Sequence, residues 1–187
     1  MAHKMLPVIP AAEISRRVAE LGAEISALYK DQPLVCVCVL KGAFLFFSDL
    51  VRRIDISSVN IGSANIGSGG PEIDFVRLAS YGNATSRGRQ TVFTKDLEVD
   101  VAGKHVLVVE DIVDTGRSAE FLLHVLGKRG AASLKICAFI DKHERREVGV
   151  KVDFAGFPIQ KGFIVGYGMD YAEKYRELDA VYELVPE

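Results

Sequence analysis

The fold is decided by one stretch of the chain, residues 106–118, which reads Val106-Leu107-Val108-Val109-Glu110-Asp111-Ile112-Val113-Asp114-Thr115-Gly116-Arg117-Ser118. Its four leading apolar residues predict a strand that is buried on both faces. Glu110 and Asp111 then place two carboxylates at the carboxyl end of that strand, which is where open α/β sheets bind their ligands. The stretch therefore predicts an α/β fold with a ligand site directly after this strand.

The second half of the stretch has the composition of a phosphate-binding turn. Residues 114–118 are small, hydroxyl-bearing or glycine for the most part, and a helix is expected to open near Ser118. Backbone N–H groups of such a turn, together with a helix N-terminus, form a cradle for a phosphate. Carboxylates beside the cradle would repel the ligand unless a divalent cation or ribose hydroxyls lie between them. The combination favours a phosphorylated sugar held with magnesium.

Two simpler interpretations stay open on the residues alone. In the first, the stretch is only a strand, a turn and a helix with Ser118 as its N-cap, and the acids are solvated. In the second, it belongs to a receiver-type domain, which also gathers acids at strand ends. Ile112 and Val113 argue against the interpretation with solvated acids, because they separate Asp111 from Asp114. A solvated charge run has no reason to contain two aliphatic residues.

Length and composition predict one cytoplasmic domain over residues 1–187. About half of the residues (49%) are apolar, so a substantial core can be buried, and the net charge of −2 argues against nucleic acid as a partner. Cys36, Cys38 and Cys137 lie in apolar segments and are expected to be reduced core thiols. No segment resembles a signal peptide or is long enough to cross a membrane, so we expect no membrane partner.

Hydrophobic periodicity gives an alternation of helices and strands. Apolar residues spaced by three and four predict a helix over residues 10–29, and a short covering helix is expected over 44–54. A third helix is expected from 118 to 130. Strands are expected over residues 34–40, 73–78, 90–93, 106–109, 134–140 and 182–185, with a further late strand from 163.

Other polar residues follow the expected strands at their carboxyl ends. Lys41 and Gly42 come after the first strand, where an ammonium and a backbone N–H can meet an anion; a plain turn with an exposed lysine is equally compatible. Lys142 follows the strand over 134–140, although it also lies in a charged run that could simply be solvated. Residues 80–89 read as a polar loop, and Phe163 would ordinarily be a core residue.

Residues 108–118 closely resemble the phosphoribosyl-diphosphate signature of the type I phosphoribosyltransferases, in the form of the hypoxanthine-guanine branch. The resemblance recurs in family order at Leu40-Lys41-Gly42-Ala43, Ser80-Tyr81, Asp141-Lys142 and residues 163–176, so it covers nearly the whole chain. It implies the type I phosphoribosyltransferase fold. That fold has a mostly parallel central sheet flanked by helices, expected over about residues 30–150. A small hood subdomain is expected from the N-terminal residues and from about 150–187.

The implied reaction belongs to purine salvage. The 5-phosphoribosyl group would pass from 5-phosphoribosyl 1-diphosphate to N9 of hypoxanthine or guanine, with Mg²⁺ as cofactor and diphosphate as leaving group. A xanthine-guanine phosphoribosyltransferase and a non-enzymatic regulator that binds nucleotide or RNA on the same fold are the alternatives. The resemblance leaves the preferred base open, and it leaves homodimer and homotetramer open as the assembly.

The resemblance also assigns roles to residues. It makes Asp114 the general base at purine N7, and it makes residues 80–89 a lid over the site. It assigns the phosphoribosyl group and its 5-phosphate to Glu110, Asp111, Ile112, Val113, Thr115, Gly116, Arg117 and Ser118. It assigns the diphosphate to Lys41, Gly42, Ser80, Tyr81 and Arg176, with a cis peptide bond between Lys41 and Gly42.

The purine and the metal receive the remaining assignments. Lys142 would donate to the 6-oxo group, Phe163 would stack on the ring, and the backbone of Ile164 would meet the edge of the base. Asp170 completes the purine side of the site. The magnesium contacts are assigned to Glu110, Asp111 and Asp170.

One segment departs from the family pattern. Asn60-Ile61-Gly62-Ser63 is repeated as Asn65-Ile66-Gly67-Ser68 and is followed by Gly69-Gly70-Pro71. Such glycine and serine density predicts a flexible loop. We expect residues 60–71 to be dispensable for catalysis, with any role confined to assembly.

Overall fold

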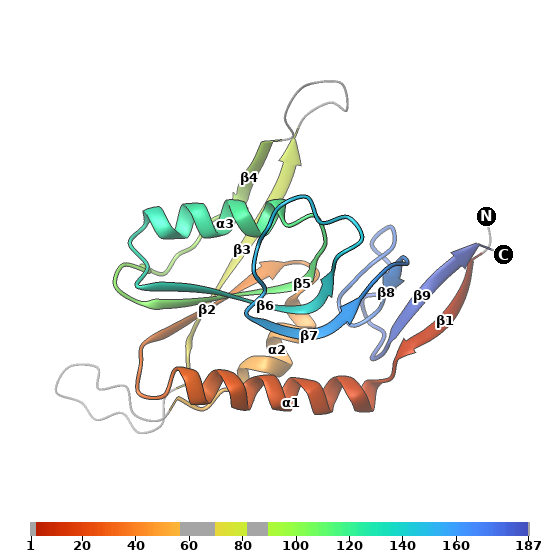
Figure 1. The fold of residues 1–187 in the computed structure, drawn as a ribbon, viewed down its shortest axis with the longest axis horizontal. Helices are drawn as coiled ribbons and strands as arrows, with labels where there is room; N and C mark the ends of the chain where they lie inside the picture. Colours follow the sequence, from red (N-terminus) through yellow and green to blue (C-terminus); the bar gives the residue numbers. More distant parts are fainter. Residues whose placement is uncertain (1–2, 57–69, 82–89, 187) are drawn as a thin grey trace.

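The computed structural model describes residues 3–56, 70–81 and 90–186 (Figure 1). In chain order the elements are β1 (His3–Ile9), α1 (Ala11–Leu28), β2 (Leu34–Leu40), α2 (Phe44–Val51), β3 (Glu72–Tyr81), β4 (Gln90–Lys95), β5 (His105–Val113), α3 (Arg117–Lys128), β6 (Ser133–Lys142), β7 (Phe154–Ile159), β8 (Ile164–Val165) and β9 (Val181–Pro186).

A six-stranded sheet in the order β4-β3-β2-β5-β6-β7 forms the centre of the molecule. Every neighbouring pair is parallel except β3 and β4, which are antiparallel. Strand β5 lies between β2 and β6, so the end of the strand that carries the acids has a parallel neighbour on each side. The expected mostly parallel sheet with flanking helices is confirmed.

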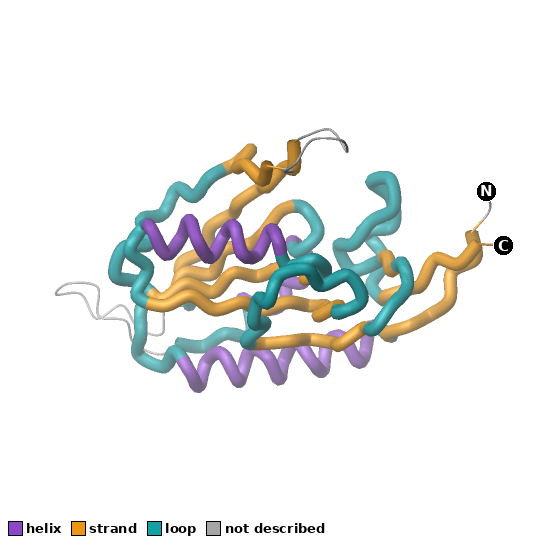
Figure 2. The backbone as a smooth tube through the Cα atoms, turned by 45° about the horizontal axis from the view of Figure 1, so that its top comes forward, coloured by secondary structure: helices purple, strands orange, loops and turns teal. Residues whose placement is uncertain are grey.

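Helices cover both faces of this sheet, as Figures 1 and 2 show from two directions. Helices α1 and α2 pack on one face over a core that contains Cys36, Cys38 and Cys137, and α3 packs on the other face over Val35 and Val37. The alternation along β2 follows from the period of two in a strand. Burial raises the pKa of Cys36 and Cys38 to about 12, so both thiols stay protonated.

A second, three-stranded sheet in the order β1-β9-β8 joins the two ends of the chain. Strands β1 and β9 pair antiparallel from His3 opposite Pro186 to Ile9 opposite Val181, and β8 pairs with the other edge of β9. The two ends lie side by side in Figure 1. Through β8 this sheet lies beside the carboxyl ends of β5 and β6, because Ile164 lines one cavity together with Asp111 and Lys142.

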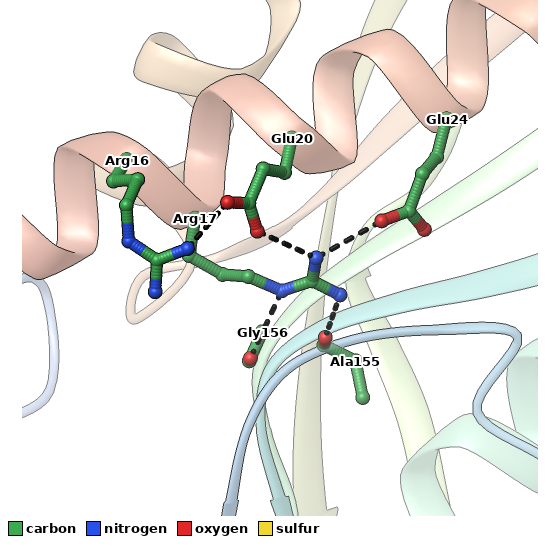
Figure 3. Close-up of polar contacts among 6 residues, drawn as sticks. All are labelled: Arg16, Arg17, Glu20, Glu24, Ala155 and Gly156. Carbon is green, nitrogen blue, oxygen red and sulfur yellow. Dashed lines mark hydrogen bonds and ion pairs between the residues drawn. The ribbon is translucent and has the colours of Figure 1, made fainter.

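Helix α1 is tied to the edge strand β7 by one arginine (Figure 3). Arg17 donates from Nε to the carbonyl oxygen of Gly156 (3.2 Å) and from Nη2 to that of Ala155 (2.8 Å). Its Nη1 also pairs with Glu20 and Glu24 on the same helix. The guanidinium therefore joins the helical layer to the outermost strand of the sheet.

Two strands were not expected from the sequence. Strand β1 is exposed on both faces except at Ile9, so it has no apolar alternation to reveal it. Strand β7 contains Gly156 and Pro158, which usually mark loops, and it tolerates the proline because it lies at the edge of the sheet.

Several expected boundaries need correction. Strand β5 does not end at Val109 but continues to Val113, because Glu110, Ile112 and Val113 still pair with β6. Helix α3 begins at Arg117 with Gly116 as its N-cap, at φ +85°, so Ser118 is not the cap. Helix α2 ends at Val51, three residues early.

Most of the departing segment lies outside the described residues, which include only Gly70 and Pro71 of it. Its expected dispensability stays a prediction. In the described part of the chain, no helix is long and apolar enough to cross a membrane.

Candidate active site

The two acids of β5 lie in poorly solvated positions, where Glu110 is buried and Asp111 is partly buried. Burial raises the pKa of Glu110 well above its usual value, and the charge of Asp111 adds to the effect. Burial also raises the pKa of Asp111 to about 6, although a bond from the backbone N–H of Ile112 and the charge of Arg176 act against it. Carboxylates held in so poorly solvated a place gain strongly from hydroxyl donors or from a cation.

The turn after β5 encloses a small cavity of about 110 Å³. The amino end of α3 opens onto it, as expected for a phosphate cradle. The carbonyl oxygen of Thr115 fixes the turn by accepting bonds from the backbone N–H groups of Glu147 and Val148. The cavity is lined by Glu110, Ile112, Val113, Asp114, Thr115, Gly116, Ser118 and Ala119.

Arg117 differs from the other predicted residues of this turn. Its side chain is not part of the cavity lining, and its Nε donates to Glu147 Oε2 over 2.6 Å. The guanidinium is thus engaged in a surface ion pair. Only its backbone belongs to the amino end of α3.

A second cavity, of about 230 Å³, brings the predicted base-binding residues together. Ile112 and Asp114 line both cavities, so the two adjoin. A larger cavity of about 610 Å³ between α1 and α2 holds none of the predicted site residues. The second cavity is lined by Asp111, Ile112, Asp114, Lys142, Arg145, Gly162, Phe163, Ile164, Met169 and Asp170.

Asp114 has the environment expected of a proton acceptor. Its Oδ1 is buried and has no hydrogen-bond partner among the described residues. Its Oδ2 lies 3.4 Å from Nη1 of Arg145, a mostly exposed side chain. An unpartnered buried acceptor that lines a cavity is a costly arrangement, and it marks a candidate functional group.

Lys142 and Phe163 line this second cavity together with Asp114. Lys142 is buried, and its Nζ donates to the carbonyl oxygen of Gly162 over 2.8 Å and lies 3.4 Å from Glu144 Oε2. Phe163 is not a core residue, because 52% of it is exposed. Its ring is nearly perpendicular to that of Tyr171, with 5.6 Å between centroids, and its exposed part is available to a planar ligand.

The two cations assigned to the diphosphate share a carboxylate. Lys41 Nζ lies 2.7 Å from Glu173 Oε2, and Arg176 Nη2 lies 3.4 Å from Glu173 Oε1. Arg176 also pairs with Asp170 over 2.6 Å and donates to the carbonyl oxygen of Gly168. The structure therefore gathers both cations around Glu173.

The loop after β2 packs so closely on Asp111 that it needs a glycine. A Cβ on Gly42 would lie 1.6 Å from Asp111 Oδ2, and a Cβ on Gly168 would lie 2.0 Å from the carbonyl oxygen of Gly42. The cis peptide bond in this loop is Leu40–Lys41, one residue before the expected bond between Lys41 and Gly42. That expectation was wrong by one position.

The predicted lid falls largely outside the described residues. Ser80 and Tyr81 end strand β3, and residues 82–89 are not described. The contact of Ser80 and Tyr81 with the diphosphate and the closing of the lid both stay predictions.

The predicted metal residues do not form a complete site by themselves. Among the described residues, no three His, Cys, Asp or Glu side chains are grouped to hold a metal ion. Asp170 already uses Oδ1 for Arg176 and Oδ2 for the backbone N–H of Glu173. Magnesium is commonly held by one or two carboxylates and by phosphate oxygens of the substrate. The partly buried Asp111, which lines the second cavity, fits that arrangement, so the donor would have to supply most of the ligands.

Sequence reasoning missed two arginines, Arg145 and Arg146. Arg145 lines the second cavity, and its Nη1 lies 3.4 Å from Asp114 Oδ2. Arg146 is largely buried and bonds to the backbone of Asp114 and Lys142. Both lie in the charged run over 141–147, where composition alone does not separate a buried arginine from a solvated one.

Known proteins resemble this chain along nearly its whole length. The phosphoribosyl transferase domain matches residues 10–172. The hypoxanthine phosphoribosyltransferase of Salmonella typhimurium is 42% identical, over 99% of this chain and 98% of its own. The hypoxanthine-guanine phosphoribosyltransferase of Bacillus subtilis is 38% identical, over 100% and 97%. A crystal structure of a Staphylococcus aureus hypoxanthine phosphoribosyltransferase superposes with a TM-score of 0.86 at 34% identity, over 97% and 91% of the two chains.

Proposed function

This chain belongs to the phosphoribosyl transferase family, and from that membership we infer that it is a hypoxanthine phosphoribosyltransferase of purine salvage. It is a glycosyltransferase that moves a phosphoribosyl group onto a purine base. The near full-length similarity to named enzymes does not favour the xanthine-guanine enzyme or a non-enzymatic regulator. The structural observation that carries the inference is the cavity that unites Asp114, Lys142 and Phe163.

We propose that the donor binds along the carboxyl end of β5. The 5-phosphate would occupy the cavity of about 110 Å³ at the amino end of α3, where backbone N–H groups and the helix dipole favour an anion. The poorly solvated carboxylates of Glu110 and Asp111 would accept bonds from the ribose hydroxyls. Magnesium, carried by the donor and held at Asp111, would neutralise charge on the diphosphate.

The diphosphate would lie against Lys41 and Arg176. Both cations are paired with Glu173, whose side chain is largely exposed. A diphosphate carries more charge than this carboxylate and would replace it as their partner. The backbone N–H groups of Lys41 and Gly42 would add further donors.

The base would lie in the adjoining cavity. Lys142 would donate to the 6-oxo group, and the open face of Phe163 would stack on the purine ring. As N9 attacks the anomeric carbon and the diphosphate leaves, Asp114 would take the proton from N7. The same carboxylate would stabilise the positive charge that develops on the ribose.

We further propose a cytoplasmic enzyme that assembles as a homodimer or homotetramer. The buried, protonated thiols of Cys36 and Cys38 are typical of a reducing compartment. The assembly follows from the family resemblance, and a measurement of molecular mass in solution tests it.

A turnover assay with hypoxanthine, guanine, xanthine and adenine tests the function and the preferred base. Hypoxanthine should be converted, and adenine should not, because it lacks the 6-oxo acceptor for Lys142. In Lys142→Ala the KM for hypoxanthine should rise about 10- to 100-fold, the value of a charge-assisted hydrogen bond, while the KM for the donor stays nearly constant. Equal rises in both KM values would place Lys142 outside the base site. Absence of transfer to any oxopurine would contradict the function itself.

A further inference from the structure

Arg146 connects the ends of two strands that carry different parts of the site. Its Nε donates to the carbonyl oxygen of Asp114 (2.9 Å), and its Nη2 donates to those of Val113 (2.8 Å) and Lys142 (3.1 Å). Two more bonds run to Asp141 Oδ1 and to the carbonyl oxygen of Val150. The side chain is only 15% exposed, so all of these bonds lie in a poorly solvated place.

The connection lies where the sheet no longer holds the two strands together. The last paired residues of β5 and β6 are Val113 and Asp141. Asp114 and Lys142 are the residues that follow directly. The guanidinium of Arg146 thus fixes the main chain of Asp114 relative to that of Lys142, one step beyond the last strand pairing.

The chemistry of an oxopurine makes this relative position important. Atoms O6 and N7 lie next to each other on one edge of the base. In the proposed function, Lys142 meets O6 and Asp114 meets N7. One base can satisfy both groups only if their separation matches that edge.

We propose that Arg146 is a positioning residue that sets the separation between the lysine that reads the 6-oxo group and the carboxylate that takes the N7 proton. The proposal rests on the proposed function. Arginine suits this role because its planar fork presents five N–H donors in fixed directions. A lysine would keep the charge but could not reach carbonyl oxygens of both strands with the same geometry.

A purely structural role for Arg146 would affect both substrates alike. Loss of folded enzyme lowers the apparent kcat and leaves each KM unchanged. A positioning role instead acts mainly on the base. Arg146 does bond to the carbonyl oxygens of Val113 and Asp114, which line the 5-phosphate cavity. Among the described residues, however, it makes no hydrogen bond to Thr115, Gly116, Ser118 or Ala119, which line that cavity toward the amino end of α3. The two roles therefore differ in the split between kcat, the KM for hypoxanthine and the KM for the donor.

The test is steady-state kinetics of Arg146→Lys, with Arg17→Lys as a matched control. Arg17 also donates to two main-chain carbonyl oxygens, but it does so on α1 and away from both site cavities. For Arg146→Lys we expect kcat/KM for hypoxanthine to fall about 10- to 100-fold, the scale of a misplaced reacting group, with the donor KM unchanged within about two-fold. Arg17→Lys should leave all three kinetic constants unchanged. Urea unfolding of both variants shows that the assays are run on folded protein.

A double-mutant cycle sharpens the test. If Arg146 acts through Lys142, then Arg146→Lys should cost much less in a Lys142→Ala background than in the wild type. Wild-type kinetics of Arg146→Lys would overturn the proposal. An equal rise in the KM for hypoxanthine and the KM for the donor would also overturn it. So would losses in kcat/KM for hypoxanthine that simply add in the double mutant. The wild-type assay on hypoxanthine tests the proposed function separately, since it contains no Arg146 variant.

Discussion

Arg17 and Arg146 make similar bonds in two different regions of the molecule. Arg17 joins α1 to the edge strand β7 through the carbonyl oxygens of Ala155 and Gly156, as Figure 3 shows. Arg146 joins the ends of β5 and β6 through three carbonyl oxygens and Asp141, and it also bonds to the carbonyl oxygen of Val150. In both regions a guanidinium satisfies main-chain acceptors that regular pairing leaves free.

The two regions differ in what lies beside the arginine. Glu20 and Glu24, beside Arg17, are surface carboxylates that water also solvates. Beside Arg146, Asp114 keeps a buried oxygen without a partner. Such an atom costs about 1–3 kcal/mol, and Asp114 also lines both site cavities, so a ligand there could offset this cost. The comparison teaches that satisfied polar clusters hold the fold together, whereas an unpartnered acceptor that lines a cavity is a candidate for the chemistry.

The largest effect is expected from Asp114 itself. Asp114→Asn removes the proton acceptor and keeps the shape of the side chain, so turnover should fall by about 10²–10⁴-fold with donor binding preserved. Single-turnover rates and donor titration measure the two quantities separately. Turnover close to that of the wild type would break the comparison, because the unpartnered oxygen would then have no role in the reaction.

Gly42→Ala should give the next largest effect. The new Cβ would lie 1.6 Å from Asp111 Oδ2, so either the acid or the loop must move. Because a displacement of about 1 Å can cost 10²-fold, we expect kcat/KM for the donor to fall by up to about that factor. Gly149→Ala, where a Cβ meets no atom within 4 Å, is the matched control. Equal kinetics of the two variants would show that close packing at Asp111 is irrelevant to donor binding.

Asp74 is a buried acid whose two carboxylate oxygens, unlike Asp114 Oδ1, both have hydrogen-bond partners among the described residues. Its side chain accepts bonds from the backbone N–H groups of Phe75, Glu98 and Val99. Burial alone would raise the pKa of Asp74, but these bonds outweigh it and hold the pKa below its usual value. Asp74→Asn should therefore lower the free energy of unfolding by about 2 kcal/mol at pH 7 and leave kcat unchanged.

The pH dependence of this loss has a definite sign. A carboxyl whose pKa is lowered on folding stabilises the protein fully above its unfolded pKa of about 3.9, and less as the pH falls below it. The difference in unfolding free energy between wild type and Asp74→Asn should thus shrink below about pH 4. Urea unfolding from pH 7 to pH 3 measures it. If the difference in unfolding free energy instead grew as the pH fell, the carboxyl of Asp74 would not be ionised in the folded protein.

Arg17→Met should have the smallest effect. The variant keeps the apolar stem and loses the bonds to β7, so we expect a loss of about 1 kcal/mol in unfolding free energy and no change in kcat or either KM. Thermal unfolding and steady-state kinetics provide the measurements. If Arg17→Met changed kcat or a KM without lowering the unfolding free energy, then Arg17, like Arg146, would act on the reaction.

The strongly patterned parts of the fold could be predicted from the sequence. The expected strand over residues 34–40 has the bounds of β2, because a fully apolar run between turn residues leaves little choice. The family resemblance also named most of the residues that line the two site cavities, but not Ala119, Arg145, Gly162 or Met169. Strand β1 could not be found, since its partner β9 is almost the whole chain away and its own side chains are mostly exposed.

The role of Arg146 was equally hidden. Its five acceptors include four main-chain carbonyl oxygens, and a carbonyl oxygen leaves no trace in residue identity. Its neighbours Glu144 and Arg145 are indeed surface residues, so the charged run correctly suggests solvent for them. Arg146, the next residue, is largely buried because it bonds to carbonyl oxygens where the pairing of β5 and β6 ends.

The pairing of β1 with β9 sets an order in time for the newly made protein. During synthesis, the segment from β2 to α3 leaves the ribosome while β9 is still unmade, and domains generally fold as their residues emerge. Strands β1 and β8 pair only through β9, so both wait for the last residues described, 181–186. A nascent chain would thus form the turn between β5 and α3 early and the second sheet last. Translation that stops before residue 181 would release a protein whose central sheet is present while His3–Ile9 remains an unpaired strand.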